Sequence, residues 1–187
     1  IGYTLDKAWH YPVSVSTTRS DGRVSKVTYA YPFTAPSGYG AIKDSLAGRH
    51  IVGRPLSQTR WVGTAKIDST LVVYGRYAGA NAPAGYFFRP SSMKYVKGTG
   101  TTLDTRITYA SYDAWGNPRS IVYGKDDTED YIWSYSHTTP VAKVTGATWS
   151  EVSSALGSST LSSLEGAVSP ADATVTSALT ALRGLAD

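Results

Sequence analysis

The sequence predicts a mainly β protein built from antiparallel hairpins in a meander, with short α-helices at its C-terminal end. Three observations predict this fold class. Apolar and polar residues alternate with period two through much of residues 1–145, which is typical of half-buried strands. Clusters of Gly, Pro, Asn and Asp separate these segments as turns do. The 14 Tyr and 5 Trp far outnumber the 3 Phe and 1 Met, and large aromatic residues favour strands.

The first hairpin is predicted from residues 11–31. A strand over 11–16 is followed by Asp21-Gly22, a strong hairpin turn because Gly tolerates positive φ. The return strand over 24–31 places Val27, Tyr29 and Tyr31 on one face, and Pro32 then blocks further pairing. Residues 33–53 read as a loose connection with one short helical turn near 41–47.

The remaining strands are expected over 54–62, 70–77, 86–97, 103–112, 119–123, 131–135 and 140–144. Pro90 is expected to interrupt the strand over 86–97. The acidic run Asp126–Asp130 lacks the spacing of a calcium loop, so it is predicted to be an exposed, solvated hairpin tip.

Residues 147–187 change character and are mostly Ala, Ser and Thr with helix signals. Thr148 and Glu151 have the spacing of a capping box, and a second helix start is predicted at Ser169-Pro170. The apolar stripe of the last helix is thin, so these helices should pack on the sheet. We therefore expect a β segment over 1–146 and a small helical segment over 147–187, both parts of a longer chain.

Charge and motif content argue against an enzyme. Residues 1–100 carry 13 Lys or Arg against 4 Asp and no Glu, whereas residues 101–187 carry 5 basic against 10 acidic residues. The chain has no Cys, and its three His are far apart, so no metal or cofactor site is predicted. No apolar run is long enough for a transmembrane helix, so no membrane insertion is expected.

Aromatic side chains offer one route to ligand binding. Exposed rings among arginines could stack on sugars, although alternating Tyr and Trp are more often cross-strand packing pairs. The same pattern occurs in single-strand nucleic-acid binding, but no RNP-like signature supports that partner. The candidates for ligand stacking are Trp61, Tyr74, Tyr77, Trp115 and Trp133.

One stretch has a more specific pattern. Residues 106–118, RITYASYDAWGNP, resemble the RHS/YD repeat, whose core reads roughly Tyr-x-Tyr-Asp-x-x-Gly-Asn. The first Tyr stands three rather than two residues before the Tyr-Asp pair, which indicates a degenerate copy or a bulge. Residues 131–152, with their Trp-Ser-Tyr and Pro-Val-Ala-Lys-Val elements, are similar to the region preceding the repeat array in large RHS-like proteins of Bacteroidetes. The repeat-turn residues are Tyr109, Tyr112, Asp113, Gly116 and Asn117.

The resemblance implies a structural role in a large protein, secreted or on the cell surface of a Gram-negative bacterium. RHS-like sheets build hollow shells that enclose a C-terminal polypeptide, often a toxin, or adhesion structures. The expected partners are flanking repeats of the parent chain, an enclosed polypeptide or a surface glycan. The family's autoproteolytic segment has no counterpart here, so no catalytic residue is implied. A carbohydrate-binding module and a glycan-active enzyme remain the alternatives.

Overall fold

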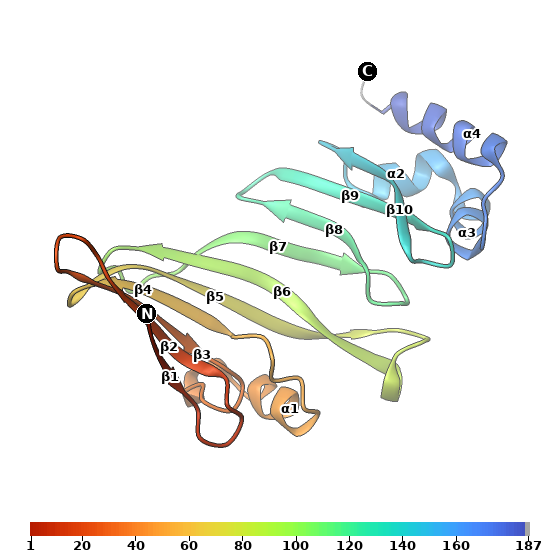
Figure 1. Ribbon diagram of the computed structural model, residues 1–187. Helices are drawn as coiled ribbons and strands as arrows, with labels where there is room; N and C mark the ends of the chain where they lie inside the picture. Colours follow the sequence, from red (N-terminus) through yellow and green to blue (C-terminus); the bar gives the residue numbers. More distant parts are fainter. Residues whose placement is uncertain (186–187) are drawn as a thin grey trace. The chain divides into compact units, whose positions relative to one another are not determined.

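The computed structural model describes residues 1–185, without the side chains of Ser37 and Pro83. Its strands pair in sequence order in one antiparallel ten-stranded meander, which confirms the predicted fold class (Figure 1). The strands are Gly2–Leu5 (β1), Pro12–Thr18 (β2), Val24–Ala30 (β3), Ser57–Val62 (β4), Ala65–Ala78 (β5), Tyr86–Lys97 (β6), Asp104–Tyr112 (β7), Pro118–Tyr123 (β8), Asp127–Ser134 (β9) and Thr139–Thr145 (β10).

The helices follow the expected distribution. Two short 3-10 turns, Ser37–Tyr39 (η1) and Pro83–Gly85 (η2), accompany the α-helices Ile42–Gly48 (α1), Trp149–Leu156 (α2), Ser158–Gly166 (α3) and Asp172–Arg183 (α4). The chain divides into two compact units. The first contains Ile1–Gly75 and Pro90–Arg106, and the second contains Arg76–Arg89 with the rest of the described chain from Ile107.

The first unit is organised around the β2–β3 hairpin. Val15 pairs with Val27 across it, and the turn closes where the Gly22 amide donates to the Arg19 carbonyl, 3.0 Å apart. The loose connection and helical turn predicted between β3 and β4 are confirmed by η1 and α1. Tyr31 and the connection that follows it contribute several buried apolar residues. These are Tyr31, Leu46, Val52 and Leu56.

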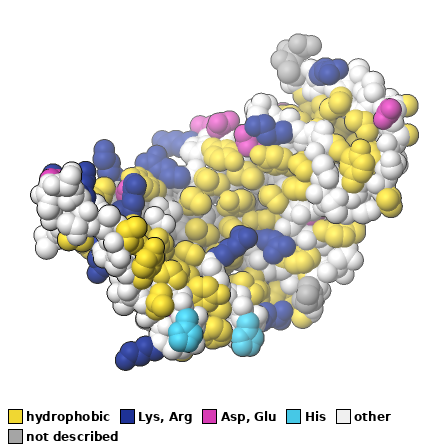
Figure 2. Space-filling model, viewed as in Figure 1, with side chains coloured by type: hydrophobic (Ala, Val, Ile, Leu, Met, Phe, Trp, Pro, Cys, Tyr) yellow, Lys and Arg dark blue, Asp and Glu magenta, His cyan; other side chains and the backbone are white. Residues whose placement is uncertain are grey.

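Strand β1 lies at an edge of the sheet and was not predicted from the sequence. Within the described part of the chain it pairs only with β2, and all four of its residues are exposed. Ile1, Tyr3 and Leu5 are exposed by 85%, 65% and 51%. Hydrophobic side chains lie at the surface on the face that Figure 2 shows, beside Lys and Arg. An exposed edge strand with apolar side chains presents backbone N–H and C=O groups with which a further strand can pair.

The second unit contains the β7–β10 hairpins and the helices α2–α4, which gather beside β9 and β10 in Figure 1. Ile132 of β9 and Val152 of α2 are almost completely buried. The helices therefore pack on the sheet as expected. The core of this unit consists of Ile132, Ala147, Val152, Leu156, Leu164, Ala178 and Leu182.

Four local predictions met different outcomes. The capping box is confirmed, since the Glu151 amide donates to Thr148 Oγ1 and the Glu151 carboxylate accepts from the Thr148 amide. The second helix start is wrong, because α4 begins at Asp172 without a side-chain cap. Strand β6 runs through Pro90, since proline keeps its carbonyl acceptor and its φ suits extended backbone.

The predicted acidic tip is also wrong. Strand β9 begins at Asp127, so most of the run Asp126–Asp130 lies within the sheet. Asp130 is fully buried. The sequence pattern misleads here because a strand face that packs under helices normally lacks carboxylates.

Candidate functional site

The site most clearly built by the sequence is the turn between β7 and β8. Asp113 Oδ1 accepts hydrogen bonds from the amides of Trp115, at 2.9 Å, and Asn117, at 2.8 Å. The backbone closes the same turn, because the Asp113 amide donates to the Asn117 carbonyl at 2.9 Å. This arrangement matches the expected role of the Asp-x-x-Gly-Asn segment, in which the aspartate bonds the turn backbone.

Gly116 is required at its position for two reasons. Its φ is +82°, a conformation that disfavours side chains other than Gly. A Cβ there would also lie 2.9 Å from the Phe87 ring. Arg89 adds to the enclosure by donating from Nε to the Gly116 carbonyl at 2.7 Å, while its guanidinium lies over the Phe87 ring.

The turn is connected to the next hairpin along the chain. Asn117 Nδ2 donates to Asp113 Oδ2 at 3.1 Å and to the His137 carbonyl at 2.6 Å. His137 belongs to the β9–β10 turn, and its Nδ1 lies 3.1 Å from Asp113 Oδ2. A carboxylate accepts such a bond from the His tautomer that carries its proton on Nδ1. The Asp113 carboxylate therefore contacts the turn backbone and the side chains of both Asn117 and His137.

The cluster is closed by an aromatic lid. The Trp115 and His137 rings stack with centroids 3.5 Å apart, and Trp115 remains 42% exposed. The Asp113 side chain is fully enclosed and that of His137 nearly so. Within the described chain, no Ser or Thr hydroxyl is hydrogen-bonded to the His137 ring. The Asp113 carboxylate thus fixes the orientation of the His137 ring through Nδ1.

The β9–β10 turn is held in an unusual backbone conformation. Tyr135, Ser136 and His137 have φ values of 51°, 53° and 63°, all in the left-handed region. Each such residue costs roughly 1–2 kcal/mol, so the contacts around the turn must stabilise it. Among them, the Ser136 amide donates to the Ala167 carbonyl at 2.8 Å. This strained turn gives His137 its buried position, and the sequence carries no glycine to signal it.

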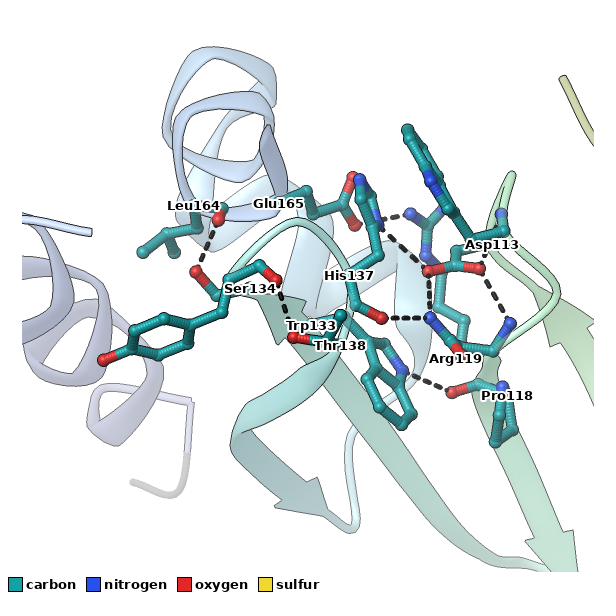
Figure 3. Close-up of polar contacts among 12 residues, drawn as sticks. Asp113, Pro118, Arg119, Trp133, Ser134, His137, Thr138, Leu164 and Glu165 are labelled. Carbon is teal, nitrogen blue, oxygen red and sulfur yellow. Dashed lines mark hydrogen bonds and ion pairs between the residues drawn. The ribbon is translucent and has the colours of Figure 1, made fainter. Parts of the chain in front are cut away.

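Further polar contacts tie these strands to the helices (Figure 3). Arg119 of β8 pairs with Glu165 of α3, and its guanidinium lies over the Trp149 ring of α2. Ser134 of β9 donates to the Leu164 carbonyl at 2.6 Å. The hairpins and helices of this unit are thus cross-linked by side chains at several points.

Two tyrosines of the expected repeat lie side by side. The Tyr109 and Tyr112 rings stack with centroids 6.0 Å apart, and the centroids of the Tyr77 and Tyr112 rings are 4.4 Å apart. The β7–β8 register shifts on both sides of Ser111. A bulge therefore accounts for the extra residue between the two repeat tyrosines.

The candidate stacking aromatics are divided between the two units. Trp61 and Tyr74 lie in the first unit, and Tyr77, Trp115 and Trp133 in the second. The indole of Trp133 donates to the Pro118 carbonyl at 2.8 Å, and that of Trp61 to Thr28 Oγ1 at 3.3 Å. Of the five rings, Trp115 alone is exposed, and its partner is His137.

Asp130 is a buried carboxylate that sequence reasoning missed. It pairs across strands with Ser120, which in turn pairs with Ser111. Among the residues that the structure describes, neither carboxylate oxygen has a hydrogen-bond partner of normal geometry, and the buried Ser111 Oγ has none either. Burial raises the pKa of Asp130 above its ordinary value, and the nearby Ser120 hydroxyl offsets part of that rise. Ionisation of the Asp130 carboxyl is therefore less favourable in the folded protein than in water.

A contrasting group of charges surrounds Glu129, the preceding residue in β9. Lys143 Nζ and the Tyr131 hydroxyl donate to its carboxylate at 2.8 and 2.7 Å. These contacts lower the pKa of Glu129, and the hydrogen bond to Glu129 together with burial raises the pKa of Tyr131 to about 12. Glu129 and Asp130 are adjacent in β9, and their environments thus shift the two carboxyl pKa values in opposite directions.

Among residues 1–185, no group of three or more His, Asp or Glu side chains is placed to hold a metal ion. Within the same residues, no helix is long and apolar enough to cross a membrane. No family model, curated protein or solved structure matches the chain.

Proposed function

We propose that the chain is a structural segment of a large RHS/YD-repeat-like protein, secreted or displayed on a Gram-negative bacterium of the Bacteroidetes type. It contributes β-sheet wall to a shell or adhesin. The observation that carries this proposal is the Asn117 amide, which donates within its own turn and to the His137 carbonyl of the next hairpin. A repeat residue that joins neighbouring hairpins is what a wall built from hairpins requires.

The sheet topology supports the same role. Every strand pairs with its neighbours in the chain, so each added hairpin extends the sheet without a crossover. Strand β1 leaves an edge with exposed Ile1, Tyr3 and Leu5. We take a flanking repeat of the parent chain as the partner of this edge, because exposed apolar edges are normally paired or covered.

An adhesive role through glycans is the second candidate. Trp115 is the one exposed ring of the proposed stacking set, and its own face is stacked on His137. A single ring with one free face offers little area for a sugar. A glycan-active enzyme would further need two carboxylates on either side of a substrate groove. The wall role therefore rests on more of the observed contacts than either alternative.

Electron microscopy of the product of the complete gene tests the proposal. We expect a sheet that continues past β1 and curves into a shell or an extended wall. A glycan array with the isolated chain provides the comparison for the adhesive alternative. An isolated globular particle together with specific glycan binding would replace the wall role by that alternative.

A further inference from the structure

A cavity of about 450 Å³ lies in the first unit, where the η1–α1 connection meets β5 and β6. Its volume falls in the range of small-molecule pockets, roughly 300–1,000 Å³. It is partly open to solvent, so a ligand could enter without unfolding the connection. Its lining residues are Gly38, Tyr39, Ile42, Leu56, Leu71, Val72, Val73, Tyr74, Lys94 and Leu103.

The walls of the cavity are largely apolar. Leu71 and Val73 occupy alternate positions of β5 and so project from the same face. Ser57 pairs with Leu71 across β4 and β5, and the Tyr39 hydroxyl donates to Ser57 Oγ at 2.8 Å. This hydrogen bond satisfies the tyrosine hydroxyl, so Tyr39 adds its ring to the apolar wall. A hydrocarbon chain would bind favourably in such a cavity, because binding removes apolar surface from water.

Lys94 is the charged residue of the lining. Its side chain is half-buried, and lysine covers apolar surface with its stem while keeping the ammonium at the water boundary. Within the described residues, no carboxylate pairs with Lys94. Asp44 binds Lys43, and Asp68 binds Arg60. The ammonium is therefore a free cation at an otherwise apolar cavity.

We propose that this cavity binds a small amphipathic carboxylate, such as a medium-chain fatty acid, with its carboxylate paired to the Lys94 ammonium. The hydrocarbon chain lies against Leu71, Val73 and Ile42. The excess of basic over acidic residues in the first hundred positions favours an anion over a cation. This site is independent of the wall role, which depends on sheet contacts elsewhere.

The test is displacement of a fluorescent fatty acid from the purified chain by decanoate and by decanol. Decanoate should compete more strongly than decanol, because only the acid pairs with the ammonium. Lys94→Met should weaken the binding of decanoate by about tenfold or more, the range expected for a charge-assisted contact. It should leave the binding of decanol unchanged. Lys97→Met, at the exposed end of the same strand, is the matched control and should change neither.

A second variant tests the location. Ile42→Trp places a large ring into the cavity from α1 and should abolish displacement by both competitors, with the fold verified by circular dichroism. Two results would overturn the proposal. One is failure of millimolar decanoate to displace the probe, and the other is equal competition by acid and alcohol that Lys94→Met does not alter.

Discussion

The Asn117 side-chain amide lies 2.6 Å from the backbone carbonyl of His137, and it also donates to the Asp113 carboxylate. Two hairpin turns separated by twenty residues are thereby joined through one side chain. The same carboxylate closes the first turn and faces the His137 ring. The repeat turn is consequently a bridge between hairpins as well as a chain reversal.

Removal of this bridge should destabilise the second unit. Asn117→Ala leaves the Asp113 carboxylate and the His137 carbonyl short of a donor, with an expected loss of about 1–3 kcal/mol in the free energy of unfolding. Chemical denaturation measures it. Asn81→Ala, at an exposed turn position, is the control and should change stability little. Equal stability of the two variants would show that the Asn117 side-chain amide does not stabilise the fold.

Gly116→Ala should be far more damaging than Gly124→Ala. Both glycines have positive φ, 82° and 62°, so each substitution carries a backbone penalty of about 1–2 kcal/mol. At Gly124 a Cβ meets no atom within 4 Å, whereas at Gly116 it meets the Phe87 ring at 2.9 Å. Overpacking should add about 1–3 kcal/mol at Gly116 alone. Thermal unfolding compares the two variants directly. Similar melting temperatures would show that the Phe87 ring does not lie close to Gly116.

Asp130→Asn should stabilise the protein at neutral pH. Burial raises the pKa of Asp130 in the folded state, so folding disfavours its ionised form. The penalty is absent below the ordinary pKa of 3.8, grows as the pH rises through the raised pKa, and is constant above it. The stability gain of the variant should therefore appear between acidic and neutral pH in urea titrations. Asp126→Asn, at an exposed turn, should show no such gain.

Asp68→Asn should have the opposite pH dependence. Hydrogen bonding to Arg60 lowers the pKa of Asp68, so its ionised form stabilises the fold above the ordinary pKa of 3.8. That contribution is lost as the pH falls through the lowered pKa. We expect a loss of at most about 1 kcal/mol at pH 7, because Arg60 is largely exposed and water screens the pair, and a smaller loss under strongly acidic conditions. A loss independent of pH would show that the pairing is not electrostatic.

The sequence was most informative where a local rule decides the structure. Period-two alternation and the Asp21-Gly22 turn predicted the first hairpin, and the spacing of Thr148 and Glu151 predicted a helix start. The Asp113-x-x-Gly116-Asn117 turn was likewise predicted because its side chains bond their own backbone. Such contacts span a few residues and are visible in the order of the chain.

Features that depend on distant contacts were not predictable in this way. His137 becomes part of the turn cluster through a left-handed backbone at Tyr135 and Ser136, residues that do not favour it by themselves. Asp130 is fully buried two residues before Ile132, which packs against the helices that follow in the chain, whereas its acidic neighbours suggested an exposed tip. The β1 strand has too few residues for a recognisable alternation. For His137 and Asp130, tertiary packing overrides the local pattern.

Hydrogen exchange at β1, read by NMR, tests the central claim most directly. The amides of Gly2–Leu5 that point away from β2 should exchange rapidly in the isolated chain. In the product of the complete gene, pairing with a flanking repeat should protect them strongly, whereas the exposed β2–β3 turn at Asp21 should exchange alike in both. Rapid exchange of the β1 amides in both proteins would contradict a continuous wall.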